Sequence, residues 1–187
     1  MIKIPEQIQD EYRRLSEVKE ARLTRDVALL GARVVLAWVF VYHGAATLFG
    51  AFGGPGVHRA SIFYGTVAHL HPATFFTVLG GSIEFFGGIA VGLGIFGRLA
   101  GASLAGDMAM AMITVTFANG IASTAPGGGY ELNLALAGLA FVVALLGTGR
   151  FSLDFGLRLW RESTRSSTPK AAGEVRYDEG PDRIPVS

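Results

Sequence analysis

Four long apolar runs occupy the middle of the chain, and short polar segments separate them. They cover residues 27–49, 73–96, 99–118 and 132–147. A helix rises about 1.5 Å per residue, so each of the first three runs reaches about 30 Å, enough to cross the hydrocarbon of a bilayer. The fourth run is shorter and crosses it only if Tyr130 and Glu131 lie at the interface. The pattern predicts four transmembrane helices, and therefore an all-α, integral membrane four-helix bundle.

The chain before the first run has the periodicity of an amphipathic helix. Within residues 2–24, apolar side chains recur at spacings of three and four: Ile4, Ile8, Tyr12, Leu15 and Val18. Charged residues of both signs lie on the other face. We interpret residues 1–26 as a cytoplasmic amphipathic arm. It lies on the membrane surface, docks onto a partner, or remains a solvated helix.

A shorter apolar stripe follows the last run. It consists of Leu153, Leu157 and Trp160, with Arg158 and Arg161 alongside. Ser152 is suited to cap the helix at its N-terminus. This predicts an interfacial helix over residues 150–161, with its arginines at the lipid headgroups. Residues 162–187 are rich in Ser, Pro, Gly and charge and are expected to form a disordered cytoplasmic tail. The membrane domain between the two ends spans residues 27–149.

Composition narrows the function further. Half of the 187 residues are hydrophobic, 17% are charged, and there are 26 glycines and no cysteine. A soluble domain carries charge on about a quarter of its residues. These values argue against a disordered chain, a nucleic-acid-binding protein and a disulfide scaffold. Without cysteine, the chain has no thiol catalysis and no thiolate metal or iron–sulfur site of its own.

The positions of the basic residues predict the orientation in the membrane. Of the sixteen, six lie in residues 1–26 and seven lie from Arg150 onward, which leaves only Arg33, Arg59 and Arg98 between. Positive charge gathers on cytoplasmic segments. We therefore expect both termini and the turn at Arg98 to be cytoplasmic. The first apolar run is too long for a cleavable signal peptide.

Glycines at helical spacing mark predicted helix contacts. Gly80, Gly88 and Gly92 share one face of the second run, and Gly97 and Gly101 form a further pair. Small residues of this kind let membrane helices approach closely. Glu84 falls on the same line as Gly80 and Gly88, so we expect it to point into the bundle. Asp107 shares a face with Ser103, Ala111 and Thr114.

Four ionisable residues lie at different predicted depths. At 1.5 Å per residue, Arg33 is roughly 9 Å from the cytoplasmic side, Asp107 roughly 13 Å, Glu84 roughly 18 Å and His43 roughly 24 Å. Such groups are costly in lipid unless paired or hydrated, and they point to function by default. One interpretation is a polar site or proton path for a redox-active or protonatable ligand. The alternative is a structural ion pair between Arg33 and either Asp107 or Glu84.

Three histidines near the predicted outer face of the membrane give weaker evidence, in this case for a metal site. His58, His69 and His71 could in principle hold a metal. His69 and His71 are separated by one residue, and no carboxylate accompanies the three until Glu131. Haem ligation is weaker still, because only His43 lies inside a predicted helix. We therefore predict no metal site.

Several short motifs, in order along the chain, resemble the DoxX family. The first is His43-Gly44, followed by Leu48-Phe49-Gly50 and by the glycine-rich stretch 52–56. The second run continues with the motif 84–88, Glu-Phe-Phe-Gly-Gly. Further matches are 119–120, 128–133 and the closing 147–154, so the resemblance covers about residues 27–158. One departure is Thr47, where the family usually has a lysine before the Leu-Phe-Gly element.

The resemblance implies a small four-helix prokaryotic membrane protein linked to redox assemblies. The family takes its name from subunits of a terminal quinol oxidase, and some members are regarded as membrane partners of soluble redox or detoxifying enzymes. On this basis we expect a multi-pass protein of the prokaryotic plasma membrane, in contact with the lipid bilayer and with protein partners. The cofactor is not specified by the sequence, and a quinone is one candidate.

Three functions remain open at this stage. The favoured one is an integral membrane subunit or scaffold of a quinone-linked or oxidative-stress assembly, without complete catalytic machinery of its own. The alternative is a quinone-reactive oxidoreductase subunit, in which Glu84, Asp107 and His43 handle protons. Arg33, His43 and Glu84 would then form the quinone pocket. A solute or proton conduit rests only on the series of buried charges.

Overall fold

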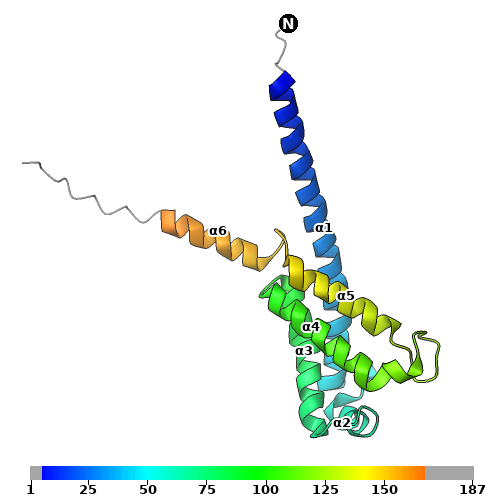
Figure 1. The fold of residues 1–187 in the computed structure, drawn as a ribbon. Helices are drawn as coiled ribbons and strands as arrows, with labels where there is room; N and C mark the ends of the chain where they lie inside the picture. Colours follow the sequence, from blue (N-terminus) through cyan, green and yellow to red (C-terminus); the bar gives the residue numbers. More distant parts are fainter. Residues whose placement is uncertain (1–5, 167–187) are drawn as a thin grey trace, which may run out of the picture.

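The computed structural model describes residues 6–166, and within that range every regular element is helical. The all-α prediction is therefore confirmed for this part of the chain. Figure 1 shows six α-helices: α1 (Glu6–Phe49), α2 (Gly56–Thr66), α3 (Ala73–Leu93), α4 (Gly97–Ala111), α5 (Glu131–Leu146) and α6 (Leu153–Ser166). Single 3₁₀ turns follow α1 and precede the loop to α5, and a π-helical turn, Met112–Thr116, extends α4.

Three of these segments are long and apolar enough to cross a membrane. They lie in α1, in α3 and in α4 with its extension to Asn119. α5 is equally apolar, but its 16 residues reach only about 24 Å. The fourth span, and with it a complete four-helix bundle, therefore stays a prediction.

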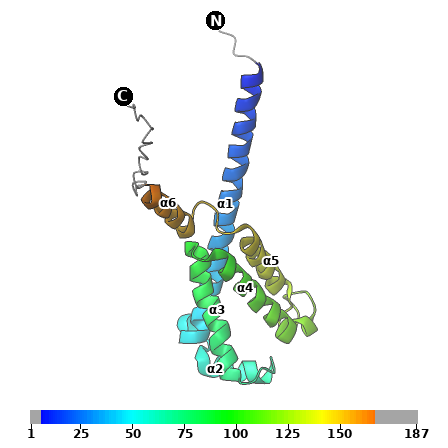
Figure 2. The same ribbon diagram turned by 60° about the vertical axis from the view of Figure 1, so that its left-hand side comes forward.

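The predicted arm and the first predicted span form one helix. α1 runs without a break through the boundary at residues 26 and 27, and its 44 residues extend about 66 Å. The arm is rich in Glu, Arg, Lys and Leu, which favour helix, and has no Gly or Pro between Glu6 and Gly31. A change in hydropathy therefore does not end the helix. Figures 1 and 2 show its N-terminal half projecting beyond all the other helices.

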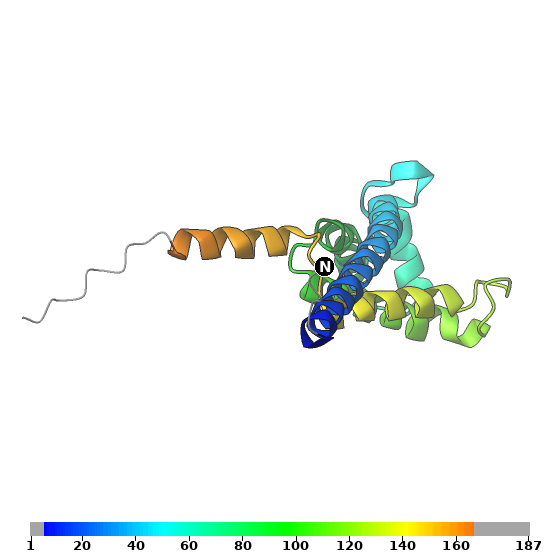
Figure 3. The ribbon, with the colours of Figure 1, turned by 90° about the horizontal axis from the view of Figure 1, so that it is seen from above.

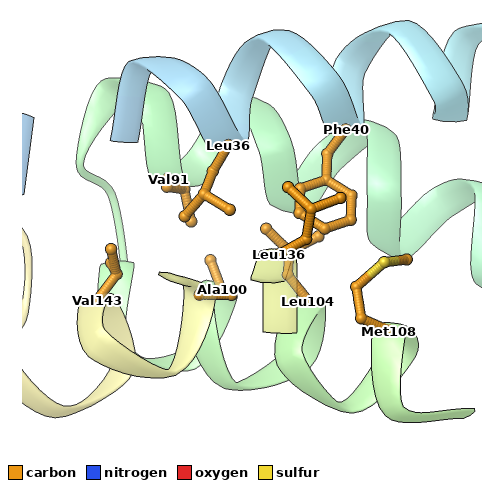
Figure 4. Packing of buried hydrophobic residues seen from close by; sticks show 9 residues of the cluster. Leu36, Phe40, Val91, Ala100, Leu104, Met108, Leu136 and Val143 are labelled. Carbon is orange, nitrogen blue, oxygen red and sulfur yellow. The ribbon is translucent and has the colours of Figure 1, made fainter. Parts of the chain in front are cut away.

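The hydrophobic core lies where four helices meet. Figure 4 shows Leu36 and Phe40 of α1 facing Val91 of α3, Leu104 of α4 and Val143 of α5. Each of these side chains is at most 1% exposed. α3 packs against both α1 and α4, and α4 packs against α5.

Small residues allow the closest helix approaches, as the glycine spacing predicts. A Cβ atom at Gly88 would lie 3.0 Å from the backbone nitrogen of Val41 on α1, and one at Gly101 would lie 2.9 Å from the carbonyl oxygen of Ala140 on α5. The closest approach between two helix backbones is at Gly44, where a Cβ would meet the backbone nitrogen of Phe85 and would lie 2.7 Å from its Cα. α1 and α3 thus touch through backbone.

The outer surface of the packed helices is apolar. Large hydrophobic side chains point outward along the spans, for example Trp38 (80% exposed) and Ile113 (70% exposed). A soluble monomer rarely exposes contiguous apolar area of this extent. The surface is consistent with contact to the lipid bilayer.

The segments rich in basic residues lie toward one end of the packed helices. The α3–α4 turn, the α5–α6 loop and the arm side of α1 lie together there, while α2 lies at the opposite end (Figure 1). This agrees with the predicted sorting of charge, although which side of the membrane the end faces stays a prediction. Seen from above, α6 points away from α4 and α5 (Figure 3).

α6 begins where the sequence predicts. The backbone N–H of Phe155 donates to the Ser152 hydroxyl at 3.2 Å, so Ser152 acts as the N-cap. The helix continues to Ser166, five residues past the predicted end at residue 161. Of the predicted disordered tail, residues 167–187 lie outside the described part of the chain.

The Gly44 contact gives a paired test of helix packing. Gly44→Ala should force α1 and α3 apart and lower the unfolding midpoint in detergent, at a cost of about 1–3 kcal/mol. Gly31→Ala is the matched control on the same helix, because no atom lies within 4 Å of its Cβ position. The control should leave the midpoint unchanged or slightly higher, since Ala favours helix over Gly. Equal effects of the two changes would contradict the packing assignment.

Candidate functional site

A cavity of about 480 Å³ lies between α2, α3 and α4. Most of its lining is apolar, with contributions from Phe63, Leu70, Phe76, Leu79, Ile83 and Met110. Its volume falls in the range of small-molecule sites, which are typically apolar with a few well-placed polar groups. The cavity lies toward the α2 end, away from the basic segments.

Two polar side chains from different helices converge over Gly80 of α3. A Cβ atom at Gly80 would lie 2.9 Å from the Tyr64 hydroxyl oxygen and 3.5 Å from Oδ1 of Asp107. Tyr64 comes from α2 and Asp107 from α4, and both line the cavity. The missing side chain at Gly80 therefore makes room for a phenol and a carboxyl group side by side.

Glu84 lies one helical turn after Gly80 and interacts electrostatically with Asp107 and with Tyr64. The structure thus brings together Glu84 and Asp107, two of the four ionisable residues that the sequence singles out. The predicted face of α4 is also present, because Ser103, Asp107, Ala111 and Thr114 all line the cavity. Glu84 itself is half-buried and is not among the residues that line the cavity.

The π-helical turn contributes an unpaired hydroxyl to the cavity. Thr114, Val115 and Thr116 of this turn are lining residues. Oγ1 of Thr116 is buried and has no hydrogen-bond partner among the described residues. A buried hydroxyl without a partner costs free energy, so its place in a cavity wall suits a ligand that supplies the missing bond. Single π turns are frequent at functional sites.

Sequence reasoning did not identify Tyr64 or Thr116 as site residues. Tyr64 lies in the segment between two apolar runs and reaches the cavity only because α2 packs back against α3. Thr116 ends the π-helical turn that begins at Met112, and its buried hydroxyl has no partner among the described residues. No spacing motif in the sequence signals either event.

Arg33 is buried but does not reach the cavity. It is 1% exposed and donates four hydrogen bonds to backbone carbonyls. Its acceptors are Val91 (2.8 Å), Gly92 (2.7 Å), Thr148 (2.8 Å) and Phe151 (2.6 Å). Neither predicted ion pair, with Asp107 or with Glu84, forms in the described residues. Asp154 is the carboxylate whose charge acts on Arg33.

His43 is exposed on α1 and does not line the cavity. Its ring meets the edge of Tyr42, with ring centroids 5.6 Å apart. The structure therefore groups Asp107, Glu84 and Tyr64, and leaves His43 and Arg33 outside this group. Within residues 6–166, no three His, Asp or Glu side chains gather closely enough to hold a metal ion.

A DoxX family model matches residues 28–117 of the chain. The resemblance that the motifs predict is thus confirmed over this range, which carries Tyr64, Glu84, Asp107 and Thr116. The arm, α5 and α6 lie outside the matched range. No curated protein and no solved structure matched the chain.

The Arg33 bonds predict a structural effect that is separate from the cavity. Arg33→Met should remove a hydrogen-bond donor from four backbone carbonyls, of which only that of Val91 keeps another donor, the backbone N–H of Gly94, and should lower the free energy of unfolding by on the order of 3 kcal/mol or more. Thermal unfolding of the detergent-solubilised protein measures this loss. Arg59→Met is the control, because Arg59 is exposed and bonds only within its own loop and helix. An unchanged midpoint for Arg33→Met would refute the structural role.

Proposed function

We propose that this membrane protein binds a small lipid-soluble redox-active molecule, best matched by a quinone, as a subunit of a membrane redox assembly. The carrying observation is the apolar cavity in which the Tyr64 hydroxyl and the Asp107 carboxyl converge over Gly80. The DoxX family model matches residues 28–117, which include every lining residue of the cavity except Asn133.

The cavity suits both the apolar ring and tail of a quinone and its polar carbonyl oxygens. Its aromatic and aliphatic lining matches an apolar ring and tail, and its volume admits a headgroup of that size. Quinone carbonyl oxygens accept hydrogen bonds, which the Tyr64 hydroxyl and the unpaired Thr116 hydroxyl can donate. A bound quinone supplies two-electron, two-proton redox chemistry.

In this proposal, the carboxyl groups of Asp107 and Glu84 transfer protons to and from the bound quinone. Asp107 lines the cavity, so its carboxyl can give a proton to a ligand oxygen or take one from it. Glu84, which does not line the cavity, interacts with Asp107 and can hold the proton that Asp107 passes on. The electrons come from a partner or a bound cofactor, because the chain has no cysteine for thiol redox chemistry.

The proposed location is the plasma membrane of a prokaryote, with both termini in the cytoplasm. This orientation rests on the positive-inside rule and on the basic segments that lie at one end of the helices. The cavity then lies toward the outer half of the membrane, on the α2 side.

A role as accessory subunit is supported by the arm. The projecting half of α1 keeps its apolar stripe exposed, with Tyr12 at 69%, Leu15 at 60% and Val18 at 50%. The stripe continues the membrane span as one rigid helix, so a soluble partner bound there would be held at a fixed distance from the bilayer. One protein can therefore bind a quinone in its cavity and hold a soluble partner on its arm within the same assembly.

Quinone binding can be tested with cavity variants. Tyr64→Phe and Asp107→Asn should each weaken binding of a short-chain quinone about tenfold, the loss of roughly one hydrogen bond of 1.4 kcal/mol. Gly106→Leu should block binding, because it lines the cavity and no atom lies within 4 Å of its Cβ position. Titration of the purified protein, followed by quenching of its intrinsic fluorescence, gives the dissociation constants.

Matched controls separate cavity effects from general ones. Gly138→Leu places the same side chain at an open position on α5 that does not line the cavity, and it should bind quinone normally. His43→Gln should also leave binding unchanged. If Gly106→Leu binds as the unaltered protein does, the cavity is not the quinone site.

The arm hypothesis makes its own prediction. Replacing Tyr12 and Leu15 with Asp should remove the apolar stripe without touching the membrane core. Purification from native membranes in mild detergent should then lose at least tenfold of a co-purifying redox protein. Arg14→Gln serves as control, since Arg14 is exposed on the same arm and the change alters charge alone. Retention of the redox protein by the Asp variant would count against the arm as the docking site.

A further inference from the structure

A second cavity, of about 380 Å³, lies where α1, α4, α5 and α6 meet. Its lining is basic, with Arg25 from α1, Arg98 from α4, Arg150 from the α5–α6 loop and Arg158 from α6. Asp154 is the one acidic residue that lines it. This cavity is at the opposite end of the packed helices from the proposed quinone site (Figure 1).

Two neighbouring cavities extend the basic surface on either side. One, of about 450 Å³, shares Arg25 and Arg150 and adds Arg22. The other, of about 440 Å³, shares Arg98 and Arg158 and adds Arg161. Together they form what we call the arginine groove, lined by Arg22, Arg25, Arg98, Arg150, Arg158 and Arg161.

The positive charge of the arginine groove is only partly offset. Its two carboxylates are Asp26 and Asp154. Asp26 lies 3.5 Å from Arg25, which is the single ion pair among the described side chains of residues 7–164. Oδ2 of Asp154 accepts the backbone N–H of Gly97 at 3.4 Å, at the start of α4. Four of the six cations have no compensating charge in the groove.

Backbone donors also line the groove. Among the described residues, the N–H groups of Thr148, Gly149 and Arg150 have no acceptor. The carbonyls of Thr148 and Phe151 in the same loop are engaged by Arg33. Gly147 and Gly149 have positive φ, a conformation that allows successive N–H groups to form an anion-binding concavity. Two carbonyls of this loop therefore accept from Arg33, while three of its described N–H groups have no acceptor.

We propose that the arginine groove binds a phosphate group, that of an anionic phospholipid or a soluble phosphate. Guanidinium groups match phosphate oxygens with paired hydrogen bonds, and basic pockets at the ends of membrane helices hold phosphorylated headgroups. α6 borders the groove, and its Leu157 and Trp160 are exposed, as in helices that lie at the lipid interface. A groove at this level meets the phosphates of one leaflet.

The test compares ligands that differ only in charge or in the lipid tail. The full-length protein in detergent is titrated with dioleoyl phosphatidylglycerol, with dioleoyl phosphatidylcholine, or with inorganic phosphate, and the unfolding midpoint is followed. A ligand that binds the folded state raises the midpoint with concentration. We expect the anionic lipid to raise it by several degrees more than the zwitterionic lipid. A rise with inorganic phosphate as well identifies the soluble ion as a ligand.

Variants assign the effect to the groove. Arg98→Gln with Arg150→Gln should weaken the anionic-lipid response at least tenfold, while the midpoint in zwitterionic lipid stays unchanged, because both side chains are exposed. Two exposed arm cations, Arg13→Gln with Arg14→Gln, give the same charge change outside the groove. The proposal is overturned if neither anion exceeds phosphatidylcholine. It is also overturned if the arm variant loses as much response as the groove variant.

Discussion

The buried guanidinium of Arg33 is the interaction on which the arrangement of the helices depends. The last carbonyls of a helix have no partner within it, and Arg33 bonds those of Val91 and Gly92 at the end of α3. Its other two bonds hold the α5–α6 loop. One side chain from α1 therefore joins segments that are 58 and 115 residues away in sequence. A Cβ at Gly94 would lie 2.6 Å from its Nη2, so glycine there gives the guanidinium its space.

The two ends of the packed helices are held by different contacts. α1 and α3 touch through backbone at Gly44, toward the α2 end, while Arg33 bonds the α5–α6 loop at the other end. Toward α2, the contact over Gly80 is made by the Tyr64 side chain instead of by a second backbone, and α4 changes to π geometry. The cavity between α2, α3 and α4 lies on this side. The Arg33 bonds and the proposed ligand site are therefore at different ends of the packed helices.

Much of this fold could be predicted from the sequence because it depends on local periodicity. Apolar runs locate the membrane segments, and glycine spacing predicts that Glu84 points into the bundle, where the structure brings it near Asp107. The partners of Arg33 could not be predicted, because backbone carbonyls leave no mark in a sequence. Depth alone also misplaces His43: it precedes Gly44, which faces α3, and successive residues on a helix are turned by about 100°. His43 therefore lies on the exposed face of α1, although its predicted depth in the membrane would suit a buried site.

The two proposed sites lie at opposite ends of the helices, and this constrains how a redox assembly could use them. From Arg98 in the arginine groove to Asp107 in the cavity, α4 rises about 14 Å, and the arm extends further in the opposite direction. A partner bound to the arm would therefore not touch a ligand beside Asp107. Electrons would then reach the cavity with a ligand that moves within the membrane, or from a donor on the α2 side. A quinone is a lipid-soluble carrier that can move within the membrane and bring electrons to the cavity. It therefore suits this arrangement better than a cofactor held by a partner on the arm, which would be too far from Asp107.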